Sequence, residues 1–362
     1  MSKILFLVAH RPGRSPGQRF RFEQYLDFLQ QKGFNYEISF LLNEEDDACF
    51  YSKGHYFRKL GIFFKSIRIR LNDVRRSSEF DVIFIYREAV MFGSAWFERR
   101  LKRKGARMIL DFDDAIWLMD VSEGNRNLRW LKKPSKTSGI LKLMGKAIVG
   151  NSFLAAYASA FNKDVWVIPT TIDTDIFKRL NLPKNPEKIY IGWIGSHTTM
   201  KHFELALGVL KMLNEKYPGK ISIKLISDTN YPTDDIAIDF CKWNKDTEIA
   251  DLSAIDIGIM PLPDNDWARG KCGFKGLQYM ALEIPAVMSP VGVNIEIIQD
   301  GVNGFLASSE EEWIMKLSML IESAELRERI GKAGRQTVVE NYSYERWKGE
   351  FLKCLKEATV PT

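Results

Sequence analysis

The feature that most constrains this chain is an alternation of strands and helices that occurs twice along its 362 residues. Short apolar runs, typical of strands buried in parallel sheets, alternate with segments of helical periodicity. The expected strands of the first series are 3–9, 35–42, 81–86, 106–111, 146–150 and 165–168, and those of the second are 188–195, 221–226, 255–261 and 285–289. This alternation predicts an α/β protein with two tandem doubly wound, Rossmann-like domains.

The expected domains are separated by a polar, proline-punctuated linker. We expect a first domain at 1–168, the linker at 169–187 and a second domain at 188–341. Residues 342–362 have a helical pattern and are expected to cross back over the domain junction. Ligands of open α/β sheets bind beyond the carboxyl ends of the strands, so two such edges facing one cleft could hold two substrates.

The charge of the chain is uneven, although its composition is that of an ordinary globular protein. Residues 1–168 contain 29 Lys and Arg against 18 Asp and Glu, a net charge of +11, whereas the remainder carries −5. Such asymmetry indicates that the first half meets an anionic partner, either a nucleic acid or a membrane surface. A nucleic acid is disfavoured, because the basic stretch lacks the aromatic alternation of a stacking platform and contains no known reader module.

The densest basic stretch is 51–76, with eight Lys and Arg against the single acid Asp73. Apolar side chains recur in it at helical spacing: Leu60, Phe63, Phe64, Ile67 and Leu71. A basic amphipathic helix of this kind suits an anionic lipid surface. The alternative is a helix that packs its apolar stripe on its own domain and leaves its charges in water.

Cysteines and apolar runs exclude several classes of protein. Cys49, Cys241, Cys272 and Cys354 lie far apart, which argues against zinc ribbons, iron–sulfur sites and redox dithiols. No apolar run is long enough for a transmembrane helix, and the N-terminal stretch lacks a signal-peptide cleavage pattern. We therefore expect a cytoplasmic protein, with peripheral association with the inner face of the membrane as a further expectation from residues 51–76.

Two stretches of the second half are suited to binding an anion. Gly195 and Ser196 follow a strand and open a helix, although an ordinary N-cap would have the same pattern. The cations Arg269, Lys271 and Lys275 cluster before and at the start of another helix. Positive charge there opposes the helix dipole, so an anionic group between these cations would explain them, and an exposed basic loop is the alternative.

In the first half, the stretch MILDFDDAIW ends a strand with three carboxylates, Asp111, Asp113 and Asp114. One interpretation is a substrate site, in which Asp113 or Asp114 orients or deprotonates a hydroxyl group. A divalent-metal site and a solvated helix start are the alternatives.

Arginines gather around the same strand ends. The loop after the first strand contains four of them, Arg11, Arg14, Arg19 and Arg21, together with Gly17, and would suit an acceptor that carries phosphate. Arg87 would flank the same edge, although structural ion pairs explain these arginines equally well. His197 and His202 lie on different helix faces and are interpreted as non-ligands.

The run KCGFKGLQYMALEIPAVMSPVGVNIEIIQDGVNGFL resembles the donor-binding segment of retaining GT-B glycosyltransferases of glycosyltransferase family 4 (glycosyl transferases group 1). SPGQRFRFEQYL, NSFLAAYASAFNKDVWVIPTTIDTDIF and AGRQTVVENYSYERW resemble other parts of that family, so the resemblance touches both halves. It implies a GT-B fold, retention of anomeric configuration and no obligatory metal or other cofactor. By resemblance, Lys275 with Lys271 or Arg269 would hold the donor diphosphate and stabilise the leaving nucleotide. The other donor-site residues implied are Gly195, Ser196, Lys201, Trp243, Gln278 and Glu296.

The chain departs from the family pattern at four positions. The family commonly has a pair of glutamates in the donor segment, and these fall at Gly270 and Gln278. Glu283 stands where a glycine is usual, and Trp193 where an arginine is usual, a cation that Lys201 would then supply. These changes leave the identity of the donor open.

Together these features predict a glycosyltransferase that moves a sugar from a nucleoside diphosphate sugar to a saccharide or lipid-linked acceptor. Its place would be in the biosynthesis of cell-surface polysaccharide or another glycan. The alternatives are a nucleotide-sugar epimerase of the same fold, a nucleic-acid-binding protein, and an inactive transferase-like subunit.

Overall fold

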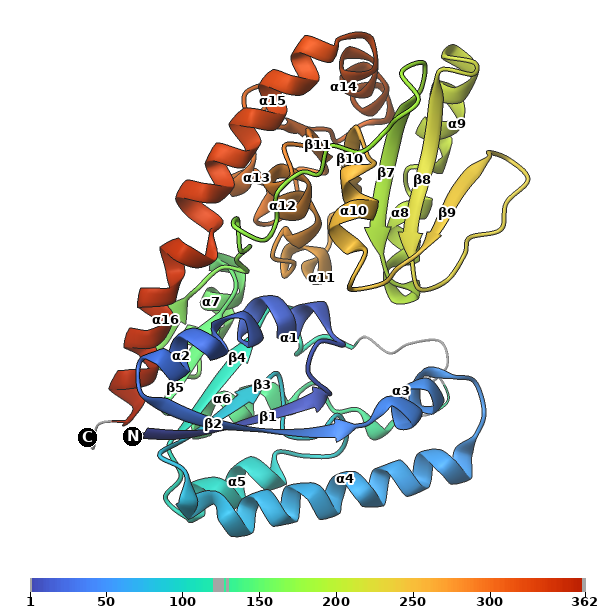
Figure 1. Ribbon diagram of the computed structural model, residues 1–362. Helices are drawn as coiled ribbons and strands as arrows, with labels where there is room; N and C mark the ends of the chain where they lie inside the picture. The colour runs from blue at the N-terminus through green and yellow to red at the C-terminus, as the bar shows by residue number, and fades with distance from the viewer. Residues whose placement is uncertain (1, 120–126, 128–129, 360–362) are drawn as a thin grey trace. The chain divides into compact units, whose positions relative to one another are not determined.

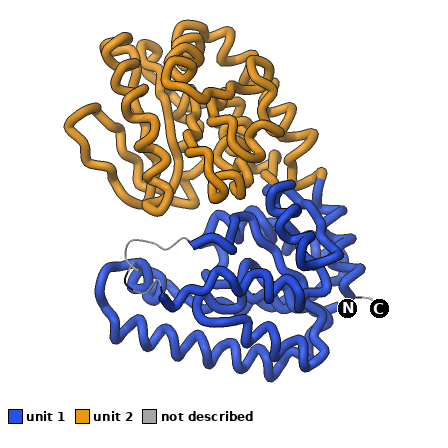
Figure 2. Tube along the Cα trace, turned by 180° about the vertical axis from the view of Figure 1, so that it is seen from behind, with its two compact units in different colours: residues 1–170, 347–362 blue, residues 171–346 orange. Residues whose placement is uncertain are grey.

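The computed structural model describes residues 2–119, 127 and 130–359, and these form two compact units (Figures 1 and 2). Unit 1 consists of residues 1–170 and 347–362, and unit 2 of residues 171–346. Most of the expected linker, from Thr171 onward, is thus counted with unit 2, and most of the C-terminal helix with unit 1. In the described part of the chain, no helix is long and apolar enough to cross a membrane.

Unit 1 is built on a six-stranded parallel sheet with the order β2-β1-β3-β4-β5-β6. Its strands are β1 (Ser2–His10), β2 (Phe34–Leu42), β3 (Val82–Tyr86), β4 (Met108–Phe112), β5 (Lys146–Val149) and β6 (Val165–Val167). Its helices are α1 (Pro16–Arg21), α2 (Leu26–Gln31), α3 (Glu44–Tyr51), α4 (Tyr56–Arg76), α5 (Trp96–Arg103), α6 (Lys136–Leu143) and α7 (Ser152–Ser159). Because all strands run parallel, their carboxyl ends gather at one edge of the sheet.

The core of unit 1 contains side chains from the N-terminal part of the chain and from its C-terminal helix. The ring centroid of Phe6 on β1 lies 4.8 Å from that of Phe22 and 5.0 Å from that of Phe84. Helix α16 (Tyr344–Thr359) contributes Phe351, whose ring stacks on Tyr25 at 4.5 Å. Burial of these aromatic rings holds the C-terminal helix on the first sheet.

Unit 2 repeats the architecture with the strand order β12-β11-β10-β7-β8-β9. Its strands are β7 (Ile189–Gly195), β8 (Ile221–Ser227), β9 (Ile238–Lys242), β10 (Ile257–Met260), β11 (Ala286–Met288) and β12 (Phe305–Leu306). Its helices are α8 (Met200–Glu204), α9 (Leu207–Lys216), α10 (Glu248–Ser253), α11 (Asp266–Arg269), α12 (Phe274–Ala281), α13 (Asn294–Ile297), α14 (Glu310–Glu322) and α15 (Ala324–Thr337). A buried cluster around Trp193, Phe203, Leu210 and Trp313 packs helices α9 and α14 on this sheet.

The predicted α/β class with two doubly wound sheets is confirmed, and all ten predicted strands are present. Two short edge strands, β9 and β12, were not predicted. The helix expected after Gly195 is divided into a 3-10 turn at His197–Thr199, helix α8 and helix α9.

Candidate functional site

In unit 2, the predicted anion-binding loop follows the carboxyl end of β7. A Cβ atom on Gly195 would lie 2.1 Å from the Trp193 ring, so only glycine lets the strand end on this indole. Ser196 caps the following turn: its amide donates to the Thr199 hydroxyl at 3.1 Å. The structure thus has the ordinary N-cap that the sequence left as an alternative, and it places Lys201 in the exposed part of the short helix α8.

The three cations predicted to meet the donor diphosphate lie between β10 and the first turn of α12. The ammonium of Lys275 is 5.4 Å from the ring centroid of Trp193, and that of Lys271 is 4.9 Å from the ring centroid of Trp267. Arg269 is more exposed and donates from Nε to Asp264 at 2.8 Å. The two lysines are therefore held against aromatic faces, while the arginine has carboxylate neighbours on its own loop.

One backbone contact brings Arg269 against the loop that precedes helix α13, which carries Glu296. Gly292 has a φ of 56°, and a Cβ atom on it would lie 2.6 Å from the carbonyl oxygen of Arg269. Glu296 is exposed on the short helix α13 that follows. Burial raises the pKa of Tyr342 to about 12, and the charge of Glu296 adds to this shift.

Gln278 and Trp243 both meet a residue that the sequence analysis did not single out, Glu248. The indole Nε1 of Trp243 donates to Glu248 Oε1 at 3.1 Å, and the amide Nε2 of Gln278 donates to the same oxygen at 3.3 Å. Glu248 and Gln278 are buried. Glu248 is the first residue of α10, a position where an acid is expected for helix capping alone, so its neighbours could not be anticipated.

In unit 1, the two candidate catalytic carboxylates share one arginine. Asp113 Oδ1 accepts from Arg87 Nη2 at 2.8 Å and from the Tyr86 hydroxyl at 2.8 Å, while Asp114 accepts from the same Arg87 nitrogen. Gly17 packs against this group, because a Cβ atom on it would lie 2.0 Å from the Tyr86 hydroxyl oxygen. The predicted residues Gly17, Arg87, Asp113 and Asp114 are thus brought together at the carboxyl edge of the sheet.

Arg21 and Asp111 form a separate, buried pair, which corrects the predicted acceptor role of Arg21. The guanidinium donates from Nε to Asp111 Oδ2 at 3.2 Å, and its other nitrogens donate to Asp111 Oδ1 and to the carbonyl of Ile168. Both side chains are almost inaccessible to solvent. Burial raises the pKa of Asp111 although Arg21 opposes the shift. This pair holds β4 and the end of β6 together and is not available to an acceptor.

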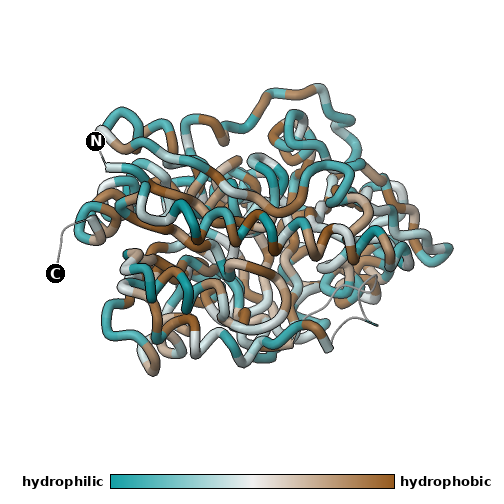
Figure 3. Tube along the Cα trace, turned by 90° about the horizontal axis from the view of Figure 1, so that it is seen from below, coloured by the Kyte–Doolittle hydropathy of each residue, from teal (hydrophilic) through white to brown (hydrophobic). Residues whose placement is uncertain are grey.

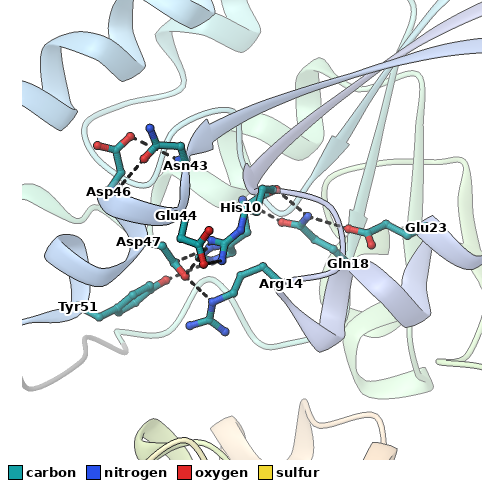
Figure 4. Close-up of polar contacts among 10 residues, drawn as sticks. His10, Arg14, Gln18, Glu23, Asn43, Glu44, Asp46, Asp47 and Tyr51 are labelled. Carbon is teal, nitrogen blue, oxygen red and sulfur yellow. Dashed lines mark hydrogen bonds and ion pairs between the residues drawn. The ribbon is translucent and has the colours of Figure 1, made fainter. Parts of the chain in front are cut away.

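Arg14 belongs to a third group, which is centred on Asp47 of α3 (Figure 4). Arg14 donates to Asp47 Oδ2, and His10 Nδ1 lies 3.2 Å from Asp47 Oδ1. Burial would raise the pKa of Asp47, but the contacts with His10 and Arg14 outweigh it and lower the pKa to about 2. Tyr51 closes the group, with its hydroxyl 3.2 Å from His10 Nε2.

Arg19 and the two histidines have the following contacts. Arg19 lies over its neighbour Phe20, with the guanidinium carbon 5.1 Å from the ring centroid. His197 pairs with Asp228 at 2.8 Å, and His202 is buried. Within residues 2–119, 127 and 130–359, no group of three or more His, Cys, Asp and Glu side chains is arranged to hold a metal ion.

The family comparison matches the part of unit 2 that contains these donor-site candidates. Residues 238–337 match the model of the family described as glycosyl transferases group 1. The second unit carries a glycosyl transferases group 1 domain.

Two curated relatives match parts of the chain. The chain is 27% identical over 260 residues to the sulfoquinovosyl transferase of Arabidopsis thaliana, an alignment that covers 63% of this chain and 47% of that protein. It is 33% identical over 81 residues to spore coat protein SA of Bacillus subtilis, which covers 22% of each. The aligned parts thus span less than half the length of both relatives.

Solved structures match nearly the whole chain. Sucrose-phosphate synthase from Thermosynechococcus elongatus aligns with a TM-score of 0.72 and 12% identity over 99% of both chains. Anabaena HepE in complex with UDP and glucose aligns with a TM-score of 0.67 and 14% identity, over 98% of this chain and 100% of that chain. At such low identity the likeness shows the fold, which is GT-B.

Three of the departures from the glycosyl transferases group 1 pattern have local physical consequences. Glu283 follows the end of α12 with a φ of 57°, the left-handed region where a glycine is least strained. Gln278 replaces a usual glutamate, and the buried carboxylate of Glu248 lies beside it. The position of the other usual glutamate is Gly270, the residue that ends α11, so no carboxylate stands there.

Proposed function

We propose that this protein is a retaining glycosyltransferase that moves a sugar from a nucleoside diphosphate sugar to a saccharide or lipid-linked acceptor. The observation that carries the proposal is the cluster of Arg269, Lys271 and Lys275 between β10 and the first turn of α12. It follows the carboxyl end of a parallel strand, where α/β sheets bind ligands, and it lies inside the segment matched by the glycosyl transferases group 1 family.

In this proposal the cations act on the charge that develops as the glycosidic bond breaks. The leaving nucleoside diphosphate gains negative charge, and Lys275, with Lys271 or Arg269, stabilises it electrostatically. Because protein cations can supply this stabilisation, the proposed reaction requires no metal ion. Gln278, Glu248 and Trp243 would orient the ribose and base, and Gly195, Ser196, Lys201 and Glu296 would contact the rest of the donor.

Unit 1 would bind the acceptor. The carboxylates of Asp113 and Asp114, fixed by Arg87, are suited to accept hydrogen bonds from a sugar hydroxyl and to orient it for attack. Arg14 and Arg19 would contact an anionic part of the acceptor, such as a phosphate. Retention and a place in the biosynthesis of cell-surface polysaccharide belong to the proposal through the resemblance of the donor segment. A lipid-linked acceptor would place the enzyme in the cytoplasm, at the inner face of the membrane.

Thermal unfolding with UDP, GDP, ADP, CMP and dTDP, each in magnesium and in EDTA, tests the proposal. A nucleotide at 100 times its dissociation constant adds about 2.7 kcal/mol of stability, so one nucleoside diphosphate should raise the melting temperature without metal. The matching donor is then incubated with and without acceptor saccharides, and the anomeric configuration of the product is read by NMR. Conversion of the donor alone would identify an epimerase instead, and no stabilisation by any nucleotide would contradict the proposal.

A further inference from the structure

Helix α4 packs on unit 1 through apolar side chains, Ile62 and Val74, and through polar ones. Arg70, on the inward face, is almost completely buried. Its guanidinium donates to the carbonyl of Val8 at 2.7 Å, to the carbonyl of Ala89 at 2.7 Å and to Asp73 Oδ2 at 2.9 Å. Lys59 is also buried and donates to the carbonyl of Ser52 at 2.6 Å. Directional bonds of this kind fix the rotation of the helix about its own axis.

With that rotation fixed, large apolar side chains of α4 face the solvent. Phe57 is 93% exposed, Phe64 61%, Leu60 51% and Leu71 46%. Residues 57, 60, 64 and 71 follow helical spacing and therefore share one face of the helix. The predicted stripe is therefore divided. Leu60, Phe64 and Leu71 face the solvent, whereas Phe63 packs on Phe92 with ring centroids 4.3 Å apart and Ile67 is half-buried. Figure 3 shows apolar and polar positions alternating along α4 in the view from below.

Basic side chains lie along the same exposed face. Arg68 and Arg75 are exposed and follow Phe64 and Leu71 by one helical turn. Among the described residues, neither of these two arginines forms an ion pair with an acid. Further round the helix, Arg58 pairs with Glu45 at 3.4 Å and Lys65 pairs with Asp46, both acids of α3. The exposed face itself therefore presents apolar and positive groups together.

The apolar and positive groups on this face together indicate what kind of partner would bind to it. A second copy of the same face would bring arginines against arginines, because a two-fold interface pairs a patch with itself. An anionic lipid surface satisfies both components: aromatic and aliphatic side chains enter the interface, and guanidinium groups meet lipid phosphates.

We propose that the outward face of α4, defined by Phe57, Leu60, Phe64, Arg68, Leu71 and Arg75, binds the surface of a bilayer that contains anionic lipids. The inference goes beyond the proposed transfer reaction and does not depend on it. The docking face would hold unit 1, the proposed acceptor-binding unit, at the surface where a lipid-linked acceptor resides.

The test is flotation of the full chain with vesicles of phosphatidylcholine alone or mixed with an equal part of phosphatidylglycerol, at low and high salt. The wild type should float with the mixed vesicles at low salt and bind phosphatidylcholine at least about tenfold more weakly. Phe57→Ser with Phe64→Ser, and separately Arg68→Glu with Arg75→Glu, should each weaken binding to the mixed vesicles by about tenfold or more.

Matched controls change the same types of residue on unit 2. Met315→Ser with Met319→Ser removes two exposed apolar groups one turn apart, and Lys211→Glu with Lys220→Glu reverses two exposed charges. Both controls should bind vesicles like the wild type. Nucleotide-dependent thermal stabilisation of all variants is measured in parallel, so loss of folding is recognised and failure of the proposed function is seen separately.

Three results would overturn the proposal. The first is equal binding to neutral and anionic vesicles, or to neither. The second is retention of binding in both α4 variants. The third is a concentration-dependent dimer in ultracentrifugation that Phe57→Ser with Phe64→Ser abolishes, since a second copy would then be the occupant of this face.

Discussion

The two units share a parallel-sheet architecture but hold their cations in different ways. In unit 1 the arginines at the sheet edge are bonded to carboxylates, as in Arg21 with Asp111 and Arg87 with Asp113. In unit 2 the lysines lie against indole rings, Lys275 on Trp193 and Lys271 on Trp267. A guanidinium paired with a carboxylate is fixed in direction by its hydrogen bonds, whereas the attraction of an ammonium to an aromatic face is broad in direction. Positive side chains at the sheet edge therefore stabilise the fold in unit 1, whereas those in unit 2 are suited to binding an anionic ligand.

The comparison is tested most strongly by removing a buried arginine from unit 1. Arg21→Ala leaves Asp111 buried without its partner and should lower the free energy of unfolding by about 3–5 kcal/mol. Urea unfolding followed by circular dichroism measures the loss. Arg58→Ala is the matched control, because its exposed pair with Glu45 should contribute less than about 1 kcal/mol. An Arg21 variant as stable as this control would contradict the architectural role.

Removal of a lysine from unit 2 should instead weaken ligand binding and leave stability nearly unchanged. Lys275→Ala should weaken binding of the nucleoside diphosphate by about 1.5–3 kcal/mol, or roughly 10- to 150-fold, because a charged hydrogen bond to phosphate is lost. Its free energy of unfolding should stay close to that of the wild type. Isothermal titration calorimetry measures the affinity, and Lys211→Ala on the exposed face of α9 is the control. Unchanged affinity would remove Lys275 from the donor site.

The pH dependence of stability gives a further test of the ion pairs in unit 1. The folded-state pKa of Asp47, about 2, lies below its ordinary value of 3.8, so the charged form stabilises the fold. This contribution is complete above pH 3.8 and is lost as the pH falls toward 2. Asp47→Asn should therefore lower stability by about 2 kcal/mol at pH 7, and the difference from the wild type should shrink below pH 4. Urea unfolding across this range measures it, and a difference that does not change with pH would refute the ion-pair explanation.

Much of the fold could be predicted from the sequence because the strands of a buried parallel sheet are continuous apolar runs. Residues 82–86 are all buried, and the sequence there is VIFIY. Strand β9 escaped prediction because IDFCK mixes polar and apolar residues, as an edge strand with partly exposed side chains allows. The helix after Gly195 had the right apolar period, but its division into a turn and two helices depends on local capping that the periodicity does not record.

The candidate site was predictable in residue type but not in pairing. Arg14 and Arg21 occupy one loop and one short helix, yet only Arg21 is buried, because Asp111 lies 90 positions away and reaches it across the sheet. Glu248 accepts a hydrogen bond from Gln278, although the two residues are 30 positions apart in the sequence. On α4 three residues of the predicted apolar stripe face outward, but Phe63 packs on Phe92, and long-range bonds such as those of Arg70 to Val8 and Ala89 help to set the rotation of the helix. Long-range partners determine each outcome, and periodicity within one element contains no information about them.

The smallest expected effect concerns the aromatic support of a lysine. The ammonium of Lys271 lies 4.9 Å from the ring centroid of Trp267, a contact that contributes about 0.5–1 kcal/mol at an accessible position. Trp267→Leu keeps an apolar side chain but removes the π face, so nucleotide affinity should fall by about two- to fivefold with stability nearly unchanged. Trp267→Phe keeps a weaker π face, so its nucleotide affinity measured by calorimetry should lie between that of the wild type and that of Trp267→Leu. If the leucine and phenylalanine variants bind equally well, the aromatic face does not position Lys271, and the contrast between the two units rests on Lys275 and Trp193 alone.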